Sequence, residues 1–485
     1  LVRLFLSVLI QRSLIWHRQF NILERLPGPP LKYKILGHLK EAIVSPEELP
    51  TEMHKQFKDY GGIYRLWLVY YPTVIIAEAK YAEIFFTSEA TQAKPEIYRL
   101  LHVWLGLGLL NSKGQMWHER RKLLTPAFHF SKLNEFCKVF VKNTLTLVQQ
   151  LRQYPDGSLI DVFKIIKLLT LDNICESAMG IEINALKNPN NNYIRAVEDC
   201  IHMSQERIVK PWYWFEPLFF IMSYALSHMR NIYGLKTQRH TLIFDIFILF
   251  VDCRMAFLDL LLSTCEDRSV SLSDEDLRDE VNTFMFEGHD TAAASISFTL
   301  FLLGAYPEIQ EKCYSELREI FQDSNRRPSV EDLQKMKYLE QVIKESLRLF
   351  PSVPILGREA AEDVIMDGYT IPKETIILLN VYNLHRDPKV FPDPEKFDPE
   401  RFCQEQCSGR HPYSFVPFAA GPRNCIGKKF ALMEEKVILS YILRDYMLES
   451  EHGIDELQLS FQLIIRSQKS LNVFFHRRKS DLTQL

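Results

Sequence analysis

The chain has 485 residues, of which 47% are hydrophobic, and a formal net charge of −3 at pH 7. This length and composition allow a large buried core, and the near-neutral charge gives no indication of a nucleic-acid-binding surface. The nine cysteines include no Cys-x-x-Cys pair, which argues against a zinc site or a disulfide framework and is typical of a reducing compartment.

An apolar leader opens the sequence. Residues 4–10 are apolar, but polar residues follow, and the run is shorter than the ~20 residues that a membrane-spanning helix needs. The leader is either the end of a membrane anchor that starts before this sequence or an interfacial helix with Trp16 and Phe20 on its apolar side. An ordinary surface helix is the remaining alternative.

A proline-rich break, Leu-Pro-Gly-Pro-Pro at 26–30, follows the leader. Proline fixes the backbone angle φ and cannot continue a helix, so this segment predicts a hinge that ends a membrane-associated region, residues 1–30. No second linker is evident, and we expect residues 31–485 to form a single large domain.

The rest of the chain is predicted to be mainly helical with a few short strands. The spacing of apolar residues predicts helices over 115–128, 132–152, 162–179, 273–306, 308–321, 330–350 and 425–445. Strands are predicted over 63–67, 74–77, 375–380 and within 457–476. Tyr71-Pro72 predicts a turn between the first two strands, and the segment 385–412, rich in Pro, Asp and Arg, predicts an irregular meander.

The helix predicted over 273–306 is the longest. Ser273 is a typical N-cap, the three acidic residues after it favour a helix N-terminus, and Pro307 ends the pattern. At a rise of ~1.5 Å per residue this helix would be about 50 Å long, enough to cross a whole domain.

One cysteine lies in a distinctive setting. Cys425 comes shortly after Phe418, Gly421 and Arg423, and it precedes Gly427 and a predicted helix. A cysteine at a helix N-terminus is a good metal thiolate because the helix dipole favours its negative charge. The glycines allow the backbone to pass close to a flat ligand, Phe418 can shield the sulfur from water, and Arg423 can meet a nearby anion. The alternative is a structural cysteine in a turn, which is the commoner role of a single cysteine.

This run resembles the cytochrome P450 haem-binding signature, Phe-x-x-Gly-x-Arg-x-Cys-x-Gly, at every fixed position from 418 to 427. The resemblance implies a haem b cofactor with Cys425 as the axial ligand of the iron and with Phe418, Gly421, Arg423 and Gly427 around it. It also implies the P450 fold, mainly α with small β-sheets, as one haem-binding catalytic domain. A thiolate ligand pushes electron density onto the iron and favours O–O cleavage, so the implied reaction class is monooxygenation.

Other P450 motifs follow in the expected order. Glu345 and Arg348 form a Glu-x-x-Arg pair on one helix face, which by itself is common on solvated helices. Arg401 lies in Pro-Glu-Arg-Phe, like the family's meander motif. The resemblance implies that these three residues form a buried ion network with a structural role.

Four residues resemble the family's haem-propionate ligands. Trp117 and Arg121 are four residues apart on a predicted helix, and alone they could be a surface cation–π pair. The family's Trp-x-x-x-Arg pattern implies instead that both bind a propionate, together with Arg358 and Arg423. Cations beside a low-dielectric pocket need such anionic partners.

Acidic residues in the middle of the long apolar helix need a reason. Glu287, Asp290 and Thr291 are spaced so that all three can lie on one side. A threonine there can donate to the carbonyl four residues earlier, which bends the helix and opens a groove for water or dioxygen. Oxygen activation consumes protons, and the resemblance assigns Asp290 and Thr291 to the family's acid–alcohol pair that delivers them.

The segment 280–291 resembles family 4 of the P450s, the fatty-acid ω-hydroxylase group, in its animal and arthropod-like members. In many members the glutamate that matches Glu287 forms an ester with a haem methyl, so covalent attachment of haem through Glu287 is implied. Asn282 and Ala292 stand where the family usually has aspartate and threonine, and neither change removes a proton-relay group. The implied substrate is a fatty acid or a similar lipophilic molecule, with hydrocarbons, hormones and xenobiotics as alternatives.

One stretch departs from the family pattern. Residues 242–251 are strongly apolar within a region, 236–255, where the family has a polar, charged helix. The run is either an added membrane contact or a sequence artefact such as an unspliced intron. We favour the artefact, because an exposed apolar patch of this kind promotes aggregation.

The electron donor must be a separate protein, because no Gly-x-Gly-x-x-Gly dinucleotide motif follows a predicted strand. The resemblance implies NADPH-cytochrome P450 reductase, with cytochrome b5 as a further candidate, on a basic face that includes Arg120, Lys122, Lys428 and Lys429. It also implies the cytosolic face of the endoplasmic reticulum membrane and contact with membrane lipid.

Two alternative functions stay open. The chain could be a haem-thiolate enzyme that needs no external electrons, against which the acid–alcohol pair argues. It could also be a non-catalytic haem protein.

Overall fold

A computed structural model of the chain describes residues 2–31, 37–38, 44–69, 71–128, 132–190, 192–219, 221, 272–322 and 324–478. The described chain is mainly helical with small sheets, which confirms the predicted fold class. The apolar run 242–251 lies outside the described residues. The chain divides into two compact units, each built from segments distant in sequence. Unit 1 comprises Leu1–Tyr98, Val353–Glu395 and Gly409–Cys425, and unit 2 comprises Arg99–Ser352, Lys396–Ser408 and Ile426–Leu485.

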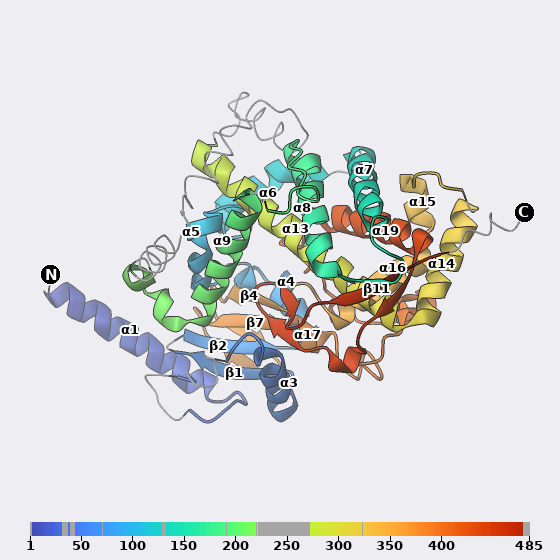
Figure 1. Cartoon of the computed structure of the whole chain (residues 1–485). Helices are drawn as coiled ribbons and strands as arrows, with labels where there is room; N and C mark the ends of the chain where they lie inside the picture. The colour runs from blue at the N-terminus through green and yellow to red at the C-terminus, as the bar shows by residue number, and fades with distance from the viewer. Residues whose placement is uncertain are drawn as a thin grey trace, which may run out of the picture. The chain divides into compact units, whose positions relative to one another are not determined.

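A four-stranded sheet organises unit 1. Its order is β1 (Ile63–Leu68), β2 (Tyr71–Ile76), β7 (Ile376–Asn380) and β4 (Ile355–Glu359), so strands from distant parts of the chain lie side by side (Figure 1). The central β2–β7 pair is parallel, and the other two pairs are antiparallel. Besides helix α1 (Val2–Leu23), the other described elements of this unit are α3 (Leu49–Tyr60), α4 (Ala79–Thr87), η1 (Glu89–Thr91), η2 (Glu96–Leu101, which crosses into unit 2), β5 (Val364–Met366), β6 (Tyr369–Ile371), α17 (Val381–Leu384) and η7 (Pro412–Ser414).

The turn predicted at Tyr71-Pro72 is wrong. Pro72 lies inside β2, opposite Trp67, and the chain reverses before it, where Val69 has a left-handed φ of 60°. Proline is tolerated because the pairing of β2 with β7 begins only at Thr73, so Pro72 needs no N–H on that side.

Helix α1 (Val2–Leu23) packs on the sheet of unit 1. The Trp16 ring lies 5.2 Å from the Phe20 ring and 5.5 Å from the Trp67 ring, and Leu23 is fully buried. The aromatic side of this helix is therefore occupied by protein, whereas Ile10 and Leu14 are exposed. Among the described residues, no single helix is both long and apolar enough to cross a membrane. Only α13 (Asp274–Ala305) and α14 (Pro307–Phe321), which are bent against each other, meet the criterion of length and composition when counted together.

Unit 2 is a helical body around α13 (Asp274–Ala305). Ser273 caps this helix and forms a capping box with Asp276, which confirms its predicted start. Gly288 of α13 packs closely on α8, since a Cβ there would lie 2.7 Å from Ile174 Cδ1. The other helices of the unit are α5 (His102–Leu105), α6 (Gly114–Leu124), η3 (Thr125–Phe128), α7 (Leu133–Leu151), α8 (Val162–Met179), α9 (Asn192–Val209), η5 (Pro211–Trp214), α14 (Pro307–Phe321), α15 (Val330–Lys335), α16 (Lys337–Leu349), η6 (Pro399–Phe402), α18 (Gln404–Cys407), α19 (Lys428–Asp445) and η8 (Ile454–Glu456).

Two small sheets complete unit 2. One has the order β3 (Ser158–Asp161), β11 (Asn472–Arg477) and β8 (Tyr446–Ser450), and the other pairs β9 (Leu459–Phe461) with β10 (Ile465–Ser467). These strands confirm the strand-like alternation predicted within 457–476.

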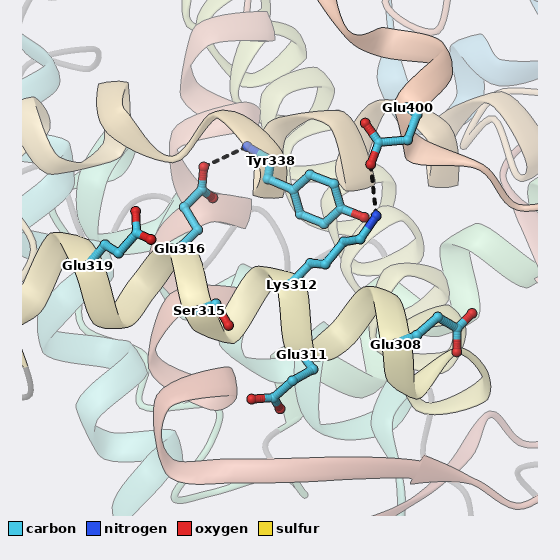
Figure 2. A pocket seen from close by; sticks show the side chains of 8 residues that line it. All are labelled: Glu308, Glu311, Lys312, Ser315, Glu316, Glu319, Tyr338 and Glu400. Atoms are coloured by element: carbon cyan, nitrogen blue, oxygen red, sulfur yellow. Dashed lines mark hydrogen bonds and ion pairs between the residues drawn. The ribbon is translucent and has the colours of Figure 1, made fainter.

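The single helix predicted over 330–350 is two helices. Ser329 and Asp332 form a capping box that begins α15, and Met336 interrupts the helix before α16. The carboxylate of Glu316 on α14 accepts a hydrogen bond from the N–H of Tyr338 at 2.7 Å (Figure 2). It also accepts one from the N–H of Leu339 at 3.0 Å. A side chain distant in sequence thus supplies the acceptors for the first turn of α16, which periodicity alone cannot reveal.

Candidate active site

The predicted cysteine loop belongs to unit 1 and ends at Cys425. The N–H of Cys425 donates to the carbonyl of Phe418 at 2.9 Å, and the N–H of Asn424 donates to the carbonyl of Gly421 at 3.1 Å. Gly421 has a left-handed φ of 67°, and a Cβ there would lie 2.2 Å from the carbonyl oxygen of Phe86. Only glycine fits this position, because the loop passes directly against the backbone at Phe86.

Cys425 differs from the core cysteines in its exposure. Cys137, Cys175 and Cys313 are buried, and burial raises the pKa of each thiol, to about 11 for Cys137. A thiol that is held neutral in this way is a poor metal ligand. Cys425 is exposed, and it precedes α19, which begins at Lys428 rather than at 425 as predicted.

Two arginines of unit 1 share a poorly hydrated region. Arg358 on β4 is buried, its Nη1 donates to the carbonyl of Gly357 at 3.0 Å, and its Nε has no hydrogen-bond partner among the described residues. Burial lowers the pKa of Arg358, and burial together with the charge of Arg358 lowers the pKa of Arg423 to about 10. Among the described residues, no carboxylate forms an ion pair with Arg358, and the one charge effect that raises its pKa comes from Tyr98. Two close cations in such a setting form a site that favours an anion.

The three predicted residues of α13 do not share one side of the helix. Glu287 is exposed and Thr291 is half-buried, whereas Asp290 is fully buried. The hydroxyl of Thr291 donates to the carbonyl of Glu287 at 2.6 Å, which is the local bond predicted for a threonine in this helix. The expectation that all three lie together is wrong because one residue step turns a helix by ~100°, which carries Asp290 into the core.

Asp290 forms an ion pair with Arg466 of β10. Burial, the largest single effect, would raise the pKa of Asp290, but the charge and hydrogen bond of Arg466 together with the charges of His289 and Lys167 outweigh it. The resulting pKa lies below the usual value. Asp290 is therefore an anion with a fixed cationic partner. Sequence reasoning missed Arg466, since no short-range pattern links it to the long helix.

Helix α6 carries Trp117, which is buried, and Arg121, which is half-buried. Arg120 between them is also buried, and its Nη1 donates to Glu280 Oε1 of α13 at 2.7 Å. It pairs with Asp276 as well. Arg120 therefore cannot belong to an exposed docking face, and its assignment to the reductase-binding surface is wrong.

Glu345, Arg348 and Arg401 come together in unit 2. Arg348 binds both carboxylate oxygens of Glu345, at 2.7 and 2.8 Å, and Arg401 Nε lies 3.5 Å from Glu345 Oε1. The N–H of Asp398 also donates to Glu345 Oε1, at 2.9 Å. Glu345 and Arg348 are fully buried, so the pair ties α16 to the meander segment without help from solvent.

Comparison with known proteins identifies the family. Residues 27–474 match the family model described as Cytochrome P450. The chain belongs to the cytochrome P450 family. It is 41% identical to human cytochrome P450 4V2 over 98% of this chain and 94% of that protein. It is 40% identical to Drosophila melanogaster cytochrome P450 4c3 over 94% and 90%, and 36% identical to Blattella germanica cytochrome P450 4c21 over 98% of each.

These relatives confirm the predicted placement in family 4, and they establish this P450 as a monooxygenase of that family. Membership implies a haem-thiolate cofactor, a reductase partner and a lipophilic substrate. These relatives are eukaryotic proteins.

A pocket of about 530 Å³ on α14 does not contain any of the predicted site residues of this P450. It is lined by Glu308, Glu311, Lys312, Ser315, Glu316, Glu319, Tyr338 and Glu400 (Figure 2). Glu316 caps α16, and Lys312 Nζ pairs with Glu400 at 3.0 Å while lying 5.4 Å from the Tyr338 ring. The lining residues therefore serve contacts between helices, and we assign the pocket no role in the reaction.

Proposed function

We propose that this P450 monooxygenase hydroxylates a fatty acid or a similar lipophilic molecule, using haem b ligated by Cys425. The observation that supports the cofactor assignment most is the Arg358–Arg423 pair. Arg358 is buried and has no acidic partner in the described chain, and Arg423 beside it is half-buried. Two such cations suit a ligand with two carboxylates, and haem b carries two propionates. Bound haem supplies an iron centre that activates O₂, and the thiolate favours O–O cleavage.

Residues of this chain hold and tune that group. In unit 1, the Phe418 carbonyl accepts a hydrogen bond from the N–H of Cys425, and Gly421 lets the loop pass close to the backbone of Phe86. These contacts hold Cys425 in place. In unit 2, we assign Trp117 and Arg121 to a propionate, and Gly427, the N-cap of α19, to the haem-binding signature. These assignments rest on the family motifs, together with the half-buried position of Arg121.

Proton delivery is assigned to Asp290 and Thr291. Thr291 holds its hydroxyl on the Glu287 carbonyl, so it offers an oxygen at the exposed side of α13. Asp290 holds a charge next to it, fixed by Arg466. Thr291→Ala should uncouple NADPH consumption from product formation, and unchanged coupling would remove the hydroxyl from the relay.

The thiolate assignment is tested by the carbon monoxide spectrum of the reduced protein. Wild type should show the strongly red-shifted Soret band of a thiolate complex, and Cys425→Ala should lose it. Cys407→Ala, a change at another exposed cysteine, is the matched control and should retain the band. An imidazole-like or thiol-like band in wild type would refute the assignment.

Glu287 is proposed to attach haem covalently, because it matches the glutamate that forms the ester in many family 4 members and its side chain is exposed in the middle of α13. Acid–acetone extraction should remove haem from Glu287→Ala but leave it on the wild-type chain. Glu275→Ala changes an exposed acid in the first turn of the same helix and should behave as wild type. Equal extraction from wild type and Glu287→Ala would contradict the ester.

Electrons are proposed to come from NADPH-cytochrome P450 reductase, with cytochrome b5 as a second donor, at the cytosolic face of the endoplasmic reticulum membrane. The exposed side chains of Ile10 and Leu14 on α1 support contact with lipid.

The substrate class is tested with fatty acids of increasing chain length. Each is assayed with the reductase, and terminal hydroxylation is measured per NADPH consumed. Efficient turnover of compact, non-lipid substrates alone would contradict it.

A further inference from the structure

A histidine outside the haem-binding signature contacts the start of the cysteine loop in unit 1. His385 directly follows α17, and its backbone N–H donates to the carbonyl of Val381 at 3.0 Å. Its side chain is fully buried, and its ring lies 5.1 Å from the ring of Phe415. Both the backbone and the ring of His385 are therefore fixed in the core of this unit.

The contact with the loop defines the state of the ring. The backbone N–H of Val416 lies 2.9 Å from His385 Nε2. A backbone amide can only donate, so Nε2 must be the acceptor, and the neutral ring carries its proton on Nδ1. Val416 is itself buried, and without this acceptor its N–H would be a buried donor that water cannot reach.

Backbone hydrogen bonds connect this contact with the cysteine. The carbonyl of Val416 accepts from the N–H of Ala419, and the carbonyl of Phe418 accepts from the N–H of Cys425, at 3.0 and 2.9 Å. Ala419 has a left-handed φ of 54°, which an alanine adopts only when its surroundings impose it. Both turns between Val416 and Cys425 therefore follow from Val416, whose backbone N–H is held by the His385 ring.

We propose that His385 is a positioning residue for the thiolate: its neutral ring, by accepting from Val416, holds the loop in the conformation in which Cys425 is a haem ligand. The inference rests on the proposed role of Cys425 and adds a residue of the meander segment to it. The loop is secured at Gly421 by close packing on Phe86 and at Val416 by one directed hydrogen bond. The directed bond can be removed without changing the loop sequence.

Three substitutions in the haem-loaded enzyme separate hydrogen bonding from packing. The side-chain amide of His385→Gln reaches about as far as Nε2 and can accept from Val416, whereas His385→Asn is too short and His385→Phe has no acceptor. The readout is the fraction of total haem that gives the thiolate-type carbon monoxide band. We expect the thiolate fraction of His385→Gln to remain near that of wild type. In His385→Asn and His385→Phe the ratio of thiolate to non-thiolate complex should fall roughly tenfold, which is the effect of one unsatisfied buried donor.

His54→Gln is the matched control. His54 Nδ1 bonds Asn383 Oδ1 of α17 at 3.0 Å, so this change affects a histidine near the same short helix but away from the loop, and the thiolate fraction should not change. If His385→Phe does not fold, the comparison of His385→Gln with His385→Asn still tests the hydrogen bond. Equal thiolate fractions for these two variants, whether both high or both low, would overturn the role of His385 alone. Absence of the thiolate band in wild type would instead overturn the proposed function, and this inference with it.

Discussion

The carboxylate of Asp290 and the guanidinium of Arg466 form an ion pair inside unit 2, although the two residues are 176 positions apart in sequence. Asp290 is fully buried on α13, and the Arg466 guanidinium also lies 4.6 Å from the centre of the Phe163 ring. The pair contributes most to keeping Asp290 ionised: burial favours the neutral acid, and Arg466, with smaller contributions from His289 and Lys167, reverses this preference. Any proton that Asp290 transfers must therefore come at the cost of weakening a specific ion pair.

Replacing Arg466 should invert the pH dependence that Asp290 gives to stability. In wild type the lowered pKa stabilises the fold above the ordinary aspartate pKa, and this contribution is lost as the pH falls through the folded-state value. In Arg466→Gln the largest of the charges that lower this pKa is gone, so we expect burial to outweigh the weaker effects of His289 and Lys167 and to raise the pKa. Stability should then fall as the pH rises above ~4. At neutral pH we expect a loss of about 3–5 kcal/mol, measured by urea unfolding, because a buried charge has lost its partner.

Lys167→Gln is the control for this change. Lys167 also lowers the pKa of Asp290, but its own ion pair is with Glu198, at 3.1 Å. Its replacement should cause a much smaller loss, and Arg466→Lys should restore most of the wild-type behaviour. Similar losses for Arg466→Gln and Lys167→Gln would contradict the specific role of Arg466.

A second pH effect should arise from Glu435 of α19. Burial raises the pKa of Glu435 to about 8, and the adjacent Glu434 is also buried with a raised pKa. Because the folded state keeps its proton above the unfolded-state pKa, this group should lower the free energy of unfolding as the pH rises from ~4.5 to ~8, by an amount on the order of a few kcal/mol. In urea unfolding, Glu435→Gln should decline less steeply with pH than wild type, and Glu434 should account for the decline that remains. Glu319→Gln changes an exposed glutamate and should show the same decline as wild type. An equally steep decline in Glu435→Gln would contradict the assignment.

The buried pair Glu345–Arg348 should matter far more than a nearby exposed pair. Glu345→Ala leaves Arg348 buried without its carboxylate, and we expect a loss of about 3–5 kcal/mol in the free energy of unfolding together with poor haem retention. Lys312→Ala removes the exposed pair with Glu400, in the same unit, and should cost less than about 1 kcal/mol (Figure 2). Chemical unfolding of both variants provides the comparison, and equal losses would show that burial does not determine the effect.

The exposed lysines Lys428 and Lys429 at the start of α19 should favour encounter with an acidic reductase. Reversing both to glutamate should slow the first reduction step by about tenfold or more at low ionic strength and weaken its salt dependence. Stopped-flow reduction at several salt concentrations measures this. The same reversal at Lys312, whose partner is Glu400, serves as the control, and unchanged kinetics in the double variant would rule out this face.

Elements with a local signal were predictable from sequence. The capping box at Ser273 and the proline at 307 define α13, and the bounds predicted for α8, 162–179, are those observed, with Gly180 ending the helix at a left-handed φ of 72°. The errors arose where tertiary partners decide. Pro72 is accommodated by its place in the sheet, and the break at Met336 is stabilised by Glu316 from another helix.

For the site, the sequence by itself determined the family and the reaction class and pointed to Cys425 as the candidate haem ligand, because the haem-binding signature is a short, contiguous arrangement of turns before a helix. Only the tertiary structure decided which charges are paired and which are buried. It placed Arg120 in the core with Glu280, gave Asp290 its partner Arg466, and brought His385 to the amide of Val416. These relationships join segments far apart in the chain, and the electrostatic cost of burial, which local sequence does not record, selects them.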